Sequence, residues 1–395
     1  MLGIAAQPWR MMKLGTTLVM IALAQSATAQ TTTDVRALLD SVVPAAMRAE
    51  QIPGAVVSVV SGGRMIFSRG YGVADLETNR PMTDSTIVRI GSISKVFTAL
   101  AVAQLADRGR IKLDANVNDY LKDVKAPRTR VPITPWHLLT HTAALDEIRP
   151  GTQANSRENL QPLREFLRGK LVVYAPVGVA TAYSTYGITL AGLLVEDVSG
   201  QTFEQYLTTN IFQPLGMRRS SIDVPNADRE HVAVPYDVEN GKPVRAPWEW
   251  YHTTPASSIN STAQDMARFM IAQLAGQSAV MSEKMTREMQ REQITMHPLM
   301  VGWGLGWQRL DRGDKEGGVQ HGGDVAGFSS LVTLLPARNF GIFVAGTARG
   351  AICASPSRTL CWAGFIRCRL HQGRRPSPCI RATSRRSASR NTPAT

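Results

Sequence analysis

Ser92 and Lys95 are the residues whose types and spacing most directly suggest chemistry. They open the stretch RIGSISKVFTALAVAQLADRG, Arg89 to Gly109, which predicts an amphipathic helix beginning near the serine. Residues three apart share one helix face at about 5–6 Å, so hydroxyl and amine can come within hydrogen-bond reach. Because the helix is nearly all apolar we expect it to be buried, and burial makes a lysine lose its proton readily. The pattern predicts a serine nucleophile beside a lysine base.

A serine and a lysine at this spacing also occur where the serine caps a helix and the lysine is solvated, and the pair alone leaves that interpretation open. Three further stretches bear on it: ITPWHLLTHTAAL, YSTYGITLAG and HGGDVAGFSS. In this order, and with the Ser92 stretch, they resemble the serine beta-lactamase superfamily, in particular its class C branch and the related esterases and D-amino-acid peptidases. The resemblance runs from about Thr32 to Thr347.

The resemblance implies that Ser92 is the acylated nucleophile, Lys95 its partner base and Tyr183 the tyrosine of a Tyr-x-Asn motif. A phenol near a lysine ammonium has a lowered pKa and can relay a proton between serine, lysine and leaving group. A core tyrosine with a hydrogen-bonded hydroxyl is the alternative interpretation of Tyr183.

His321, Gly322 and Gly323 resemble the family's third motif, a Lys-Thr-Gly or His-x-Gly strand. Glycines there let the strand backbone approach a substrate closely. The resemblance implies that the N–H of Asp324 pairs with the N–H of Ser92 as an oxyanion hole, a device worth about 3–4 kcal/mol per donor elsewhere.

Thr185 departs from the Tyr-x-Asn pattern, because it places a hydroxyl where the family has an amide that both donates and accepts. We expect this to affect recognition of amide substrates, and hence beta-lactam hydrolysis, more than acylation. A second departure follows the last expected strand, GIFVAGT, where an unusual tail replaces the family's closing helix.

His137 and His141 are four residues apart, a spacing that could form a metal-binding helix face. No acid or third ligand lies in register with them. We therefore assign both histidines to structural roles around the site and predict no metal and no cofactor.

The elements that position these residues follow from the hydrophobic periodicity. A helix over Thr32–Glu50 precedes a hairpin of GAVVSVV and RMIFSRGYGVA, the middle is mostly helical, and strands return in GLGWQRL, SSLVTLLP and FGIFVAGT. The sequence predicts an α+β fold: an antiparallel sheet formed by the two ends of the chain, flanked by helices, with a mainly helical inserted subdomain. The resemblance implies a beta-lactamase/transpeptidase-like architecture.

The net charge of +13 is concentrated at the C-terminus. Residues 351–395 hold nine arginines, no acid and all four cysteines, so the rest of the chain has 35 basic and 31 acidic residues. This distribution argues against nucleic-acid binding. The composition suggests a reading-frame shift, with a genuine basic tail as the alternative, and we expect the tail to be unstructured and to contribute nothing to the site.

Residues 1–29 are expected to be a signal peptide, because Arg10 and Lys13 precede an apolar run and a small-x-small site ends at Ala29. Residues 30–348 would form the hydrolase domain and 349–395 the tail. No other segment has the roughly 18 apolar residues that a membrane span needs. We therefore expect a periplasmic or secreted protein.

The leading hypothesis is an exported serine hydrolase that forms an acyl-enzyme at Ser92 with an ester, a beta-lactam or a D-amino-acid peptide. The alternatives are a true class C beta-lactamase and a D-alanyl-D-alanine carboxypeptidase or penicillin-binding protein with weak turnover. The sequence does not indicate the oligomeric state.

Overall fold

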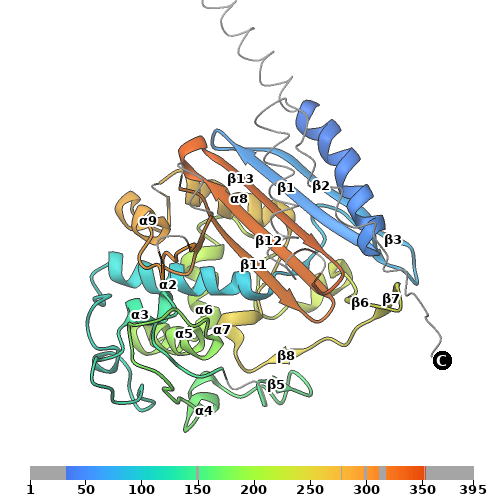
Figure 1. The fold of residues 1–395 in the computed structure, drawn as a ribbon. Helices are drawn as coiled ribbons and strands as arrows, with labels where there is room; N and C mark the ends of the chain where they lie inside the picture. Colours follow the sequence, from blue (N-terminus) through green and yellow to red (C-terminus); the bar gives the residue numbers. More distant parts are fainter. Residues whose placement is uncertain are drawn as a thin grey trace, which may run out of the picture. The chain divides into compact units, whose positions relative to one another are not determined.

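The largest element of the computed structural model is a seven-stranded antiparallel sheet, with the strand order β10-β11-β12-β13-β1-β2-β3 (Figure 1). The structure describes residues 33–147, 151–276, 278–297, 300–310, 317–350 and 352. All of them lie within one compact unit of the chain. The strands of the sheet are β1 (Gly54–Ser61), β2 (Arg64–Asp75), β3 (Arg80–Pro81), β10 (Gln308–Arg309), β11 (Val319–Val325), β12 (Phe328–Leu335) and β13 (Phe340–Gly346).

The two ends of the domain meet in the middle of this sheet, where β1 pairs with β13 and Val57 lies opposite Val344. The pairing is extended by Thr347, whose backbone N–H donates to the carbonyl of Gly54 at 2.9 Å. Both faces of β1 are buried, which explains its nearly continuous apolar sequence. The predicted α+β fold, with one sheet built from the two ends of the chain, is confirmed.

Helix α8 (Ala263–Leu274) packs against the central strands β1 and β13. Thr262 caps its N-terminus, where the side chain accepts a hydrogen bond from the N–H of Asp265. A further helix over residues 33–50 lies along β2, where Asp40 forms an ion pair with Arg69 at 2.8 Å. These helices bury the apolar side chains of the sheet.

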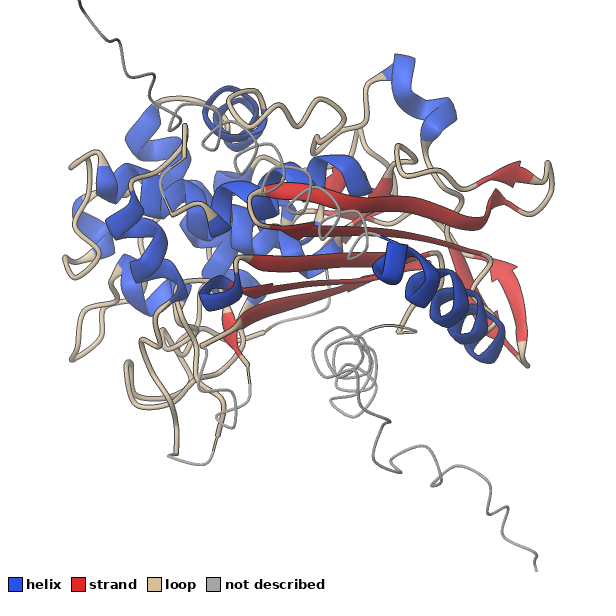
Figure 2. Ribbon diagram, turned by 90° about the horizontal axis from the view of Figure 1, so that it is seen from above, coloured by secondary structure: helices blue, strands red, loops and turns tan. Residues whose placement is uncertain are grey.

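The middle of the chain forms a mainly helical part, whose helices gather apart from the large sheet (Figure 2). Short strand pairs cross-link its loops: β4 (Val88–Arg89) with β9 (Asn260–Ser261), β5 (Gln153–Ala154) with β8 (Trp250–Tyr251), and β6 (Tyr236–Glu239) with β7 (Lys242–Arg245). The helices are α2 (Ser94–Asp107), α3 (Pro135–Leu139), α4 (Leu163–Leu167), α5 (Thr185–Ser199), α6 (Phe203–Leu207), α7 (Thr254–Ser257) and α9 (Glu283–Gln290).

Helix α2 differs from its prediction in two ways. It is buried around its whole circumference from Ser94 to Leu105, because α5, α6, α7 and α9 all pack against it, so it is not amphipathic. It also begins at Ser94, after a 3₁₀ turn over Gly91–Ile93 that carries Ser92. The serine therefore stands on a tight turn in front of the helix.

Other boundaries are shorter than the periodicity suggested. The helix face suggested by the spacing of His137 and His141 does not form, because α3 ends at Leu139 and His141 and Ala144 adopt left-handed backbone conformations with φ of 57° and 51°. Likewise, the strand expected in GLGWQRL is reduced to β10.

The proposed signal peptide and residues 353–395 lie outside the described residues. Arg349, Gly350 and Ile352 were expected at or near the start of an unstructured tail, but they pack on the domain: Ile352 is fully buried, and its N–H donates to Ser329 Oγ at 3.1 Å. Within the described residues, no helix is long and apolar enough to span a membrane.

Helices α5 and α7 pack so closely that a side chain added between them should destabilise the protein. A Cβ on Gly192 would lie 2.3 Å from Pro255 Cγ, so Gly192→Ala must push α7 away and is expected to lower the free energy of unfolding by about 1–3 kcal/mol. Gly187→Ala is the matched control in the same helix, because the nearest atom to its Cβ is 3.4 Å away. Urea denaturation measures both, and equal stabilities for the two variants would contradict the packing argument.

Candidate active site

Ser92 and Lys95 come together as their spacing predicts: Lys95 Nζ donates to Ser92 Oγ at 3.0 Å. The amine also donates to the carbonyl of Ala256 in α7 at 3.0 Å, and the side chain is 1% exposed. Gly91 makes the turn possible, because its φ is +51° and a Cβ there would lie 2.9 Å from Asp324 N. The nucleophile candidate thus sits on a turn wedged between helix and sheet.

The charge state of Lys95 follows from this burial. Loss of solvation lowers the pKa of Lys95 to about 7, and the nearby carboxylate of Glu147 opposes the shift only partly. A large fraction of the lysine is therefore a neutral amine near pH 7, with a lone pair that can accept a proton from Ser92.

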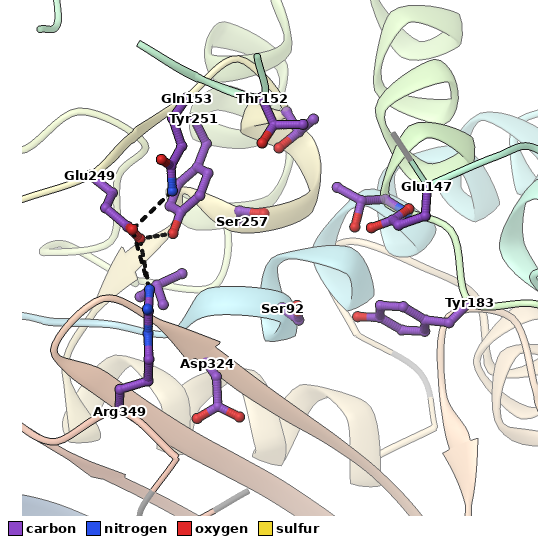
Figure 3. A pocket seen from close by; sticks show the side chains of 13 residues that line it. Ser92, Glu147, Thr152, Gln153, Tyr183, Glu249, Tyr251, Ser257, Asp324 and Arg349 are labelled. Atoms are coloured by element: carbon purple, nitrogen blue, oxygen red, sulfur yellow. Dashed lines mark hydrogen bonds and ion pairs between the residues drawn. The ribbon is translucent and has the colours of Figure 1, made fainter. Parts of the chain in front are cut away.

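Tyr183 lies over the lysine, with Lys95 Nζ 4.8 Å from the centre of its ring. It immediately precedes α5, where Ser184 caps the helix by accepting a hydrogen bond from the N–H of Gly187 at 3.0 Å. Figure 3 shows its hydroxyl directed towards Ser92. The tyrosine is 41% exposed, which excludes the alternative of a core residue.

The third motif forms strand β11 and runs directly beside the Ser92 turn. A Cβ on Gly323 would lie 2.0 Å from the carbonyl oxygen of Ile90 and 2.9 Å from Ser92 N, so only glycine permits this approach. The backbone N–H groups of Ser92 and Asp324 belong to these two adjoining segments. The predicted pair of oxyanion donors is thereby brought to one place.

His321 is part of strand β11, and its side chain is buried, with 4% exposed. Burial lowers its pKa to about 4, so the imidazole is neutral near pH 7. Its Nδ1 lies 2.7 Å from the carbonyl oxygen of Gly322, which places the proton on Nδ1 and leaves Nε2 as an acceptor. The motif therefore carries no positive charge here.

A cavity of about 970 Å³ opens beside Ser92 (Figure 3). Thr185 is in its wall, and the backbone N–H of Thr185 donates to Glu147 Oε2. The described residues that line the cavity are Ser92, Glu147, Thr152, Gln153, Tyr183, Thr185, Glu249, Tyr251, Thr253, Ser257, Asp324, Val325 and Arg349. A second cavity of about 340 Å³ shares Ser92, Tyr183 and Asp324 and is completed by Trp303, Gln308, His321 and Gly322.

Sequence reasoning missed one wall of the larger cavity, which is organised around Glu249. Its carboxylate accepts hydrogen bonds from the Tyr251 hydroxyl, from Gln153 Nε2 at 2.8 Å and from the Ala326 N–H at 3.0 Å, and it pairs with Arg349 at 3.1 Å. Burial would raise the pKa of Glu249, but these donors lower it overall. Apart from Tyr251, which is two residues from Glu249, the partners come from segments far apart in the chain.

Arg89 supports the backbone and the aromatic residues of this wall. Its buried guanidinium donates to the carbonyl of Glu249 at 2.7 Å and lies 4.8 Å from the centre of the Trp248 ring. The acid-containing run WEWY was the only local signal, since an acid among aromatic residues is unusual on a free surface.

His137 and His141 do not form a common helix face, because α3 ends between them. His137 completes a capping box with Thr134. The ring of His141 packs at a tilt against that of Tyr183 with centroids 4.6 Å apart, and its Nδ1 accepts a hydrogen bond from the N–H of Ser184 at 3.2 Å. In the described part of the chain, no three potential metal ligands cluster.

Comparison with known proteins agrees with the resemblance seen in the sequence. The family model described as Beta-lactamase matches residues 39–351. Protein flp of Staphylococcus aureus (strain MRSA252) is 26% identical over 318 residues, which is 79% of this chain and 63% of that protein, so the match spans less than two thirds of the relative. A protein named Beta-lactamase from Escherichia coli (strain K12) is 32% identical over 231 residues, 57% of each chain.

Among solved structures, the octameric penicillin-binding protein homologue from Pyrococcus abyssi has a similar fold. The TM-score is 0.72 at 25% sequence identity, with 84% of this chain and 77% of that chain covered.

The lowered pKa of Lys95 predicts a pH-dependent stability. The folded protein binds the Lys95 proton less tightly than the unfolded chain does. The stability that the neutral lysine allows is therefore present at high pH and is lost as the pH falls from 10.5 through about 7. Compared with Lys95→Met, the wild-type protein should gain about 2 kcal/mol in free energy of unfolding between pH 7 and pH 9. Urea denaturation at both pH values measures this gain, with Lys112→Met as an exposed control. If wild type and Lys95→Met differ in stability by the same amount at pH 7 and pH 9, the prediction is refuted.

The hydrogen bond from Ser184 predicts that His141 supports the Tyr183 segment. His141→Phe leaves the buried Ser184 N–H unpaired and is expected to cost about 1–3 kcal/mol of unfolding free energy. His141→Asn retains an acceptor and tolerates the left-handed backbone, so it should cost less. Thermal and urea denaturation compare the stabilities of the two variants. If His141→Phe is the more stable, packing of the ring and not the hydrogen bond to Ser184 supports this segment.

Proposed function

Since this chain belongs to the beta-lactamase family of serine hydrolases, we propose that it hydrolyses carboxylic esters through a covalent acyl-enzyme on Ser92. The observation that carries the proposal is the 3.0 Å hydrogen bond between Ser92 Oγ and Lys95 Nζ, an amine whose pKa is about 7 because it is buried. A hydroxyl in contact with a neutral amine is an activated nucleophile.

In the proposed acylation, Ser92 Oγ attacks the carbonyl carbon of the ester while its proton passes to Lys95 Nζ. The carbonyl oxygen becomes an alkoxide, which the N–H groups of Ser92 and Asp324 stabilise. When the tetrahedral intermediate collapses, the bond to the leaving oxygen breaks, and that oxygen takes a proton from the Lys95 ammonium by way of the Tyr183 hydroxyl.

Deacylation repeats these steps with water. A water molecule attacks the acyl carbonyl carbon and gives its proton to the Tyr183 and Lys95 pair, and the acid leaves as Ser92 Oγ recovers its proton. The net reaction is the addition of one water across the ester bond, and the enzyme returns to its starting state. No cofactor takes part in this scheme.

Two features favour esters over beta-lactams. Thr185 offers a hydroxyl in place of an amide and engages Glu147 through its backbone. An ester also has a better leaving group than an amide and tolerates looser positioning. The second candidate is beta-lactam hydrolysis or slow penicillin binding, because one relative is named Beta-lactamase and a similar structure is a penicillin-binding protein homologue.

We also propose that the protein is exported to the periplasm or secreted, that its substrates are small molecules and that it does not bind nucleic acid. The apolar run before Ala29 and the near balance of charge outside residues 351–395 support these proposals.

Covalent catalysis at Ser92 is tested with a fluorophosphonate and two substrates. Intact mass should show one adduct, absent in Ser92→Ala and retained in Ser85→Ala, whose serine is outside both cavities. The wild-type protein should hydrolyse p-nitrophenyl butyrate at least about 100 times faster than a chromogenic cephalosporin, a difference of about 2.7 kcal/mol in activation free energy. An adduct in Ser92→Ala would show that Ser92 is not the nucleophile. Faster turnover of the cephalosporin than of the ester would favour the second candidate.

A further inference from the structure

The two cavities at Ser92 carry an excess of negative charge among the described residues that line them. The larger cavity has the carboxylates of Glu147, Glu249 and Asp324 and one cation, Arg349. The smaller cavity has Asp324 and no cation, because its histidine, His321, is neutral near pH 7. The balance of these side chains is two negative charges.

The one cation is already engaged. Arg349 forms an ion pair with Glu249 at 3.1 Å, and the same carboxylate also binds Tyr251 and Gln153. A substrate carboxylate would have to compete with Glu249 for this guanidinium. Lys95 offers no alternative, since its buried amine is bound to Ser92 Oγ and to the carbonyl of Ala256.

Glu147 and Asp324 both line the larger cavity, and in Figure 3 the Asp324 carboxylate points away from Ser92. Glu147 accepts a hydrogen bond from the N–H of Thr185, and Asp324 Oδ1 accepts one from the N–H of Gly350 at 3.1 Å. These donors are neutral backbone groups, and no ion pair with a described cation satisfies either carboxylate. In the view of Figure 3, Ser92 lies between them.

Aromatic rings complete this environment. Tyr183 and Tyr251 line the larger cavity, and Trp303 joins Tyr183 in the smaller one. The faces of tyrosine and tryptophan attract cations, and quaternary ammonium groups in particular. Lys95 already lies over the Tyr183 ring and Arg89 over the Tyr251 ring, so the charge of the lining, more than its rings, points to a cationic substrate group.

We propose that the preferred substrates of this site are esters that carry a positively charged amine, held by Glu147 and Asp324, and that carboxylate-bearing substrates are disfavoured. This inference rests on the proposed ester hydrolysis. It gives a second and independent reason, besides Thr185, why beta-lactams with their ring carboxylate fit poorly. A cation within about 4–6 Å of these carboxylates is stabilised, whereas an anion is repelled.

Three p-nitrophenyl esters of matched length test the charge preference. Their acyl groups are 4-(trimethylammonio)butyrate, its uncharged isostere 5,5-dimethylhexanoate, and glutarate with a free carboxylate. We expect kcat/KM for the cationic ester to exceed that for the neutral one by at least about tenfold, and the anionic ester to be slowest. The preference should shrink as salt is raised from 20 to 500 mM, because ions screen it.

Substitutions show which carboxylates cause the preference for the cationic ester. Glu147→Gln keeps an acceptor for the Thr185 N–H, and Asp324→Asn changes an exposed side chain without removing the backbone N–H. Each should lower the ratio of cationic to neutral kcat/KM several-fold, whereas Asp114→Asn, an exposed acid outside both cavities, should not. The ratio within one variant is insensitive to how much of the protein is folded.

The outcomes separate the two proposals. Equal rates on the cationic and neutral esters, a faster anionic ester, or a preference that survives both substitutions overturns the charge inference while ester hydrolysis stands. No hydrolysis of any of the three esters above the Ser92→Ala background overturns the proposed function and the charge inference with it.

Discussion

Burial of the Lys95 amine is the constraint on which the rest of this site depends. A lysine that is 1% exposed is tolerated only because Ser92 Oγ and the carbonyl of Ala256 accept its hydrogens and because its pKa falls to about 7. To bury it, α2 must be covered on every side, which accounts for an almost wholly apolar helix and for Gly192, whose missing side chain lets α7 approach α5.

The sheet supplies the other half of the site by close approach of its backbone. Gly91 and Gly323 bring β11 and the Ser92 turn so near that a Cβ on either residue would clash. Strand β11 is held by β12 and the β13–β1 pairing behind it, so the position of the Asp324 N–H depends on strands from both ends of the chain. A rigid backbone donor needs this support, because a donor that moves with the substrate loses its preorganised advantage.

The walls around this centre set the charge that a substrate would meet. His321 in the third motif is neutral near pH 7, and Arg349 is held by Glu249. The proposed nucleophile and base therefore lie beside cavities whose charged side chains are mainly negative. Under the proposed charge preference, the summed field of these side chains would disfavour a carboxylate-bearing substrate.

Local patterns in the sequence determined the sheet strands, the long helices and the motif residues Ser92, Lys95, Tyr183 and His321, because each depends on short-range periodicity or on spacing within one segment. Only the tertiary structure decided where the 3₁₀ turn and the left-handed His141 end their helices, and that α2 is buried all round. It also decided that Glu147, Glu249 and Arg349 share a cavity, since their proximity arises from packing between segments up to about 200 residues apart and leaves no trace in local composition.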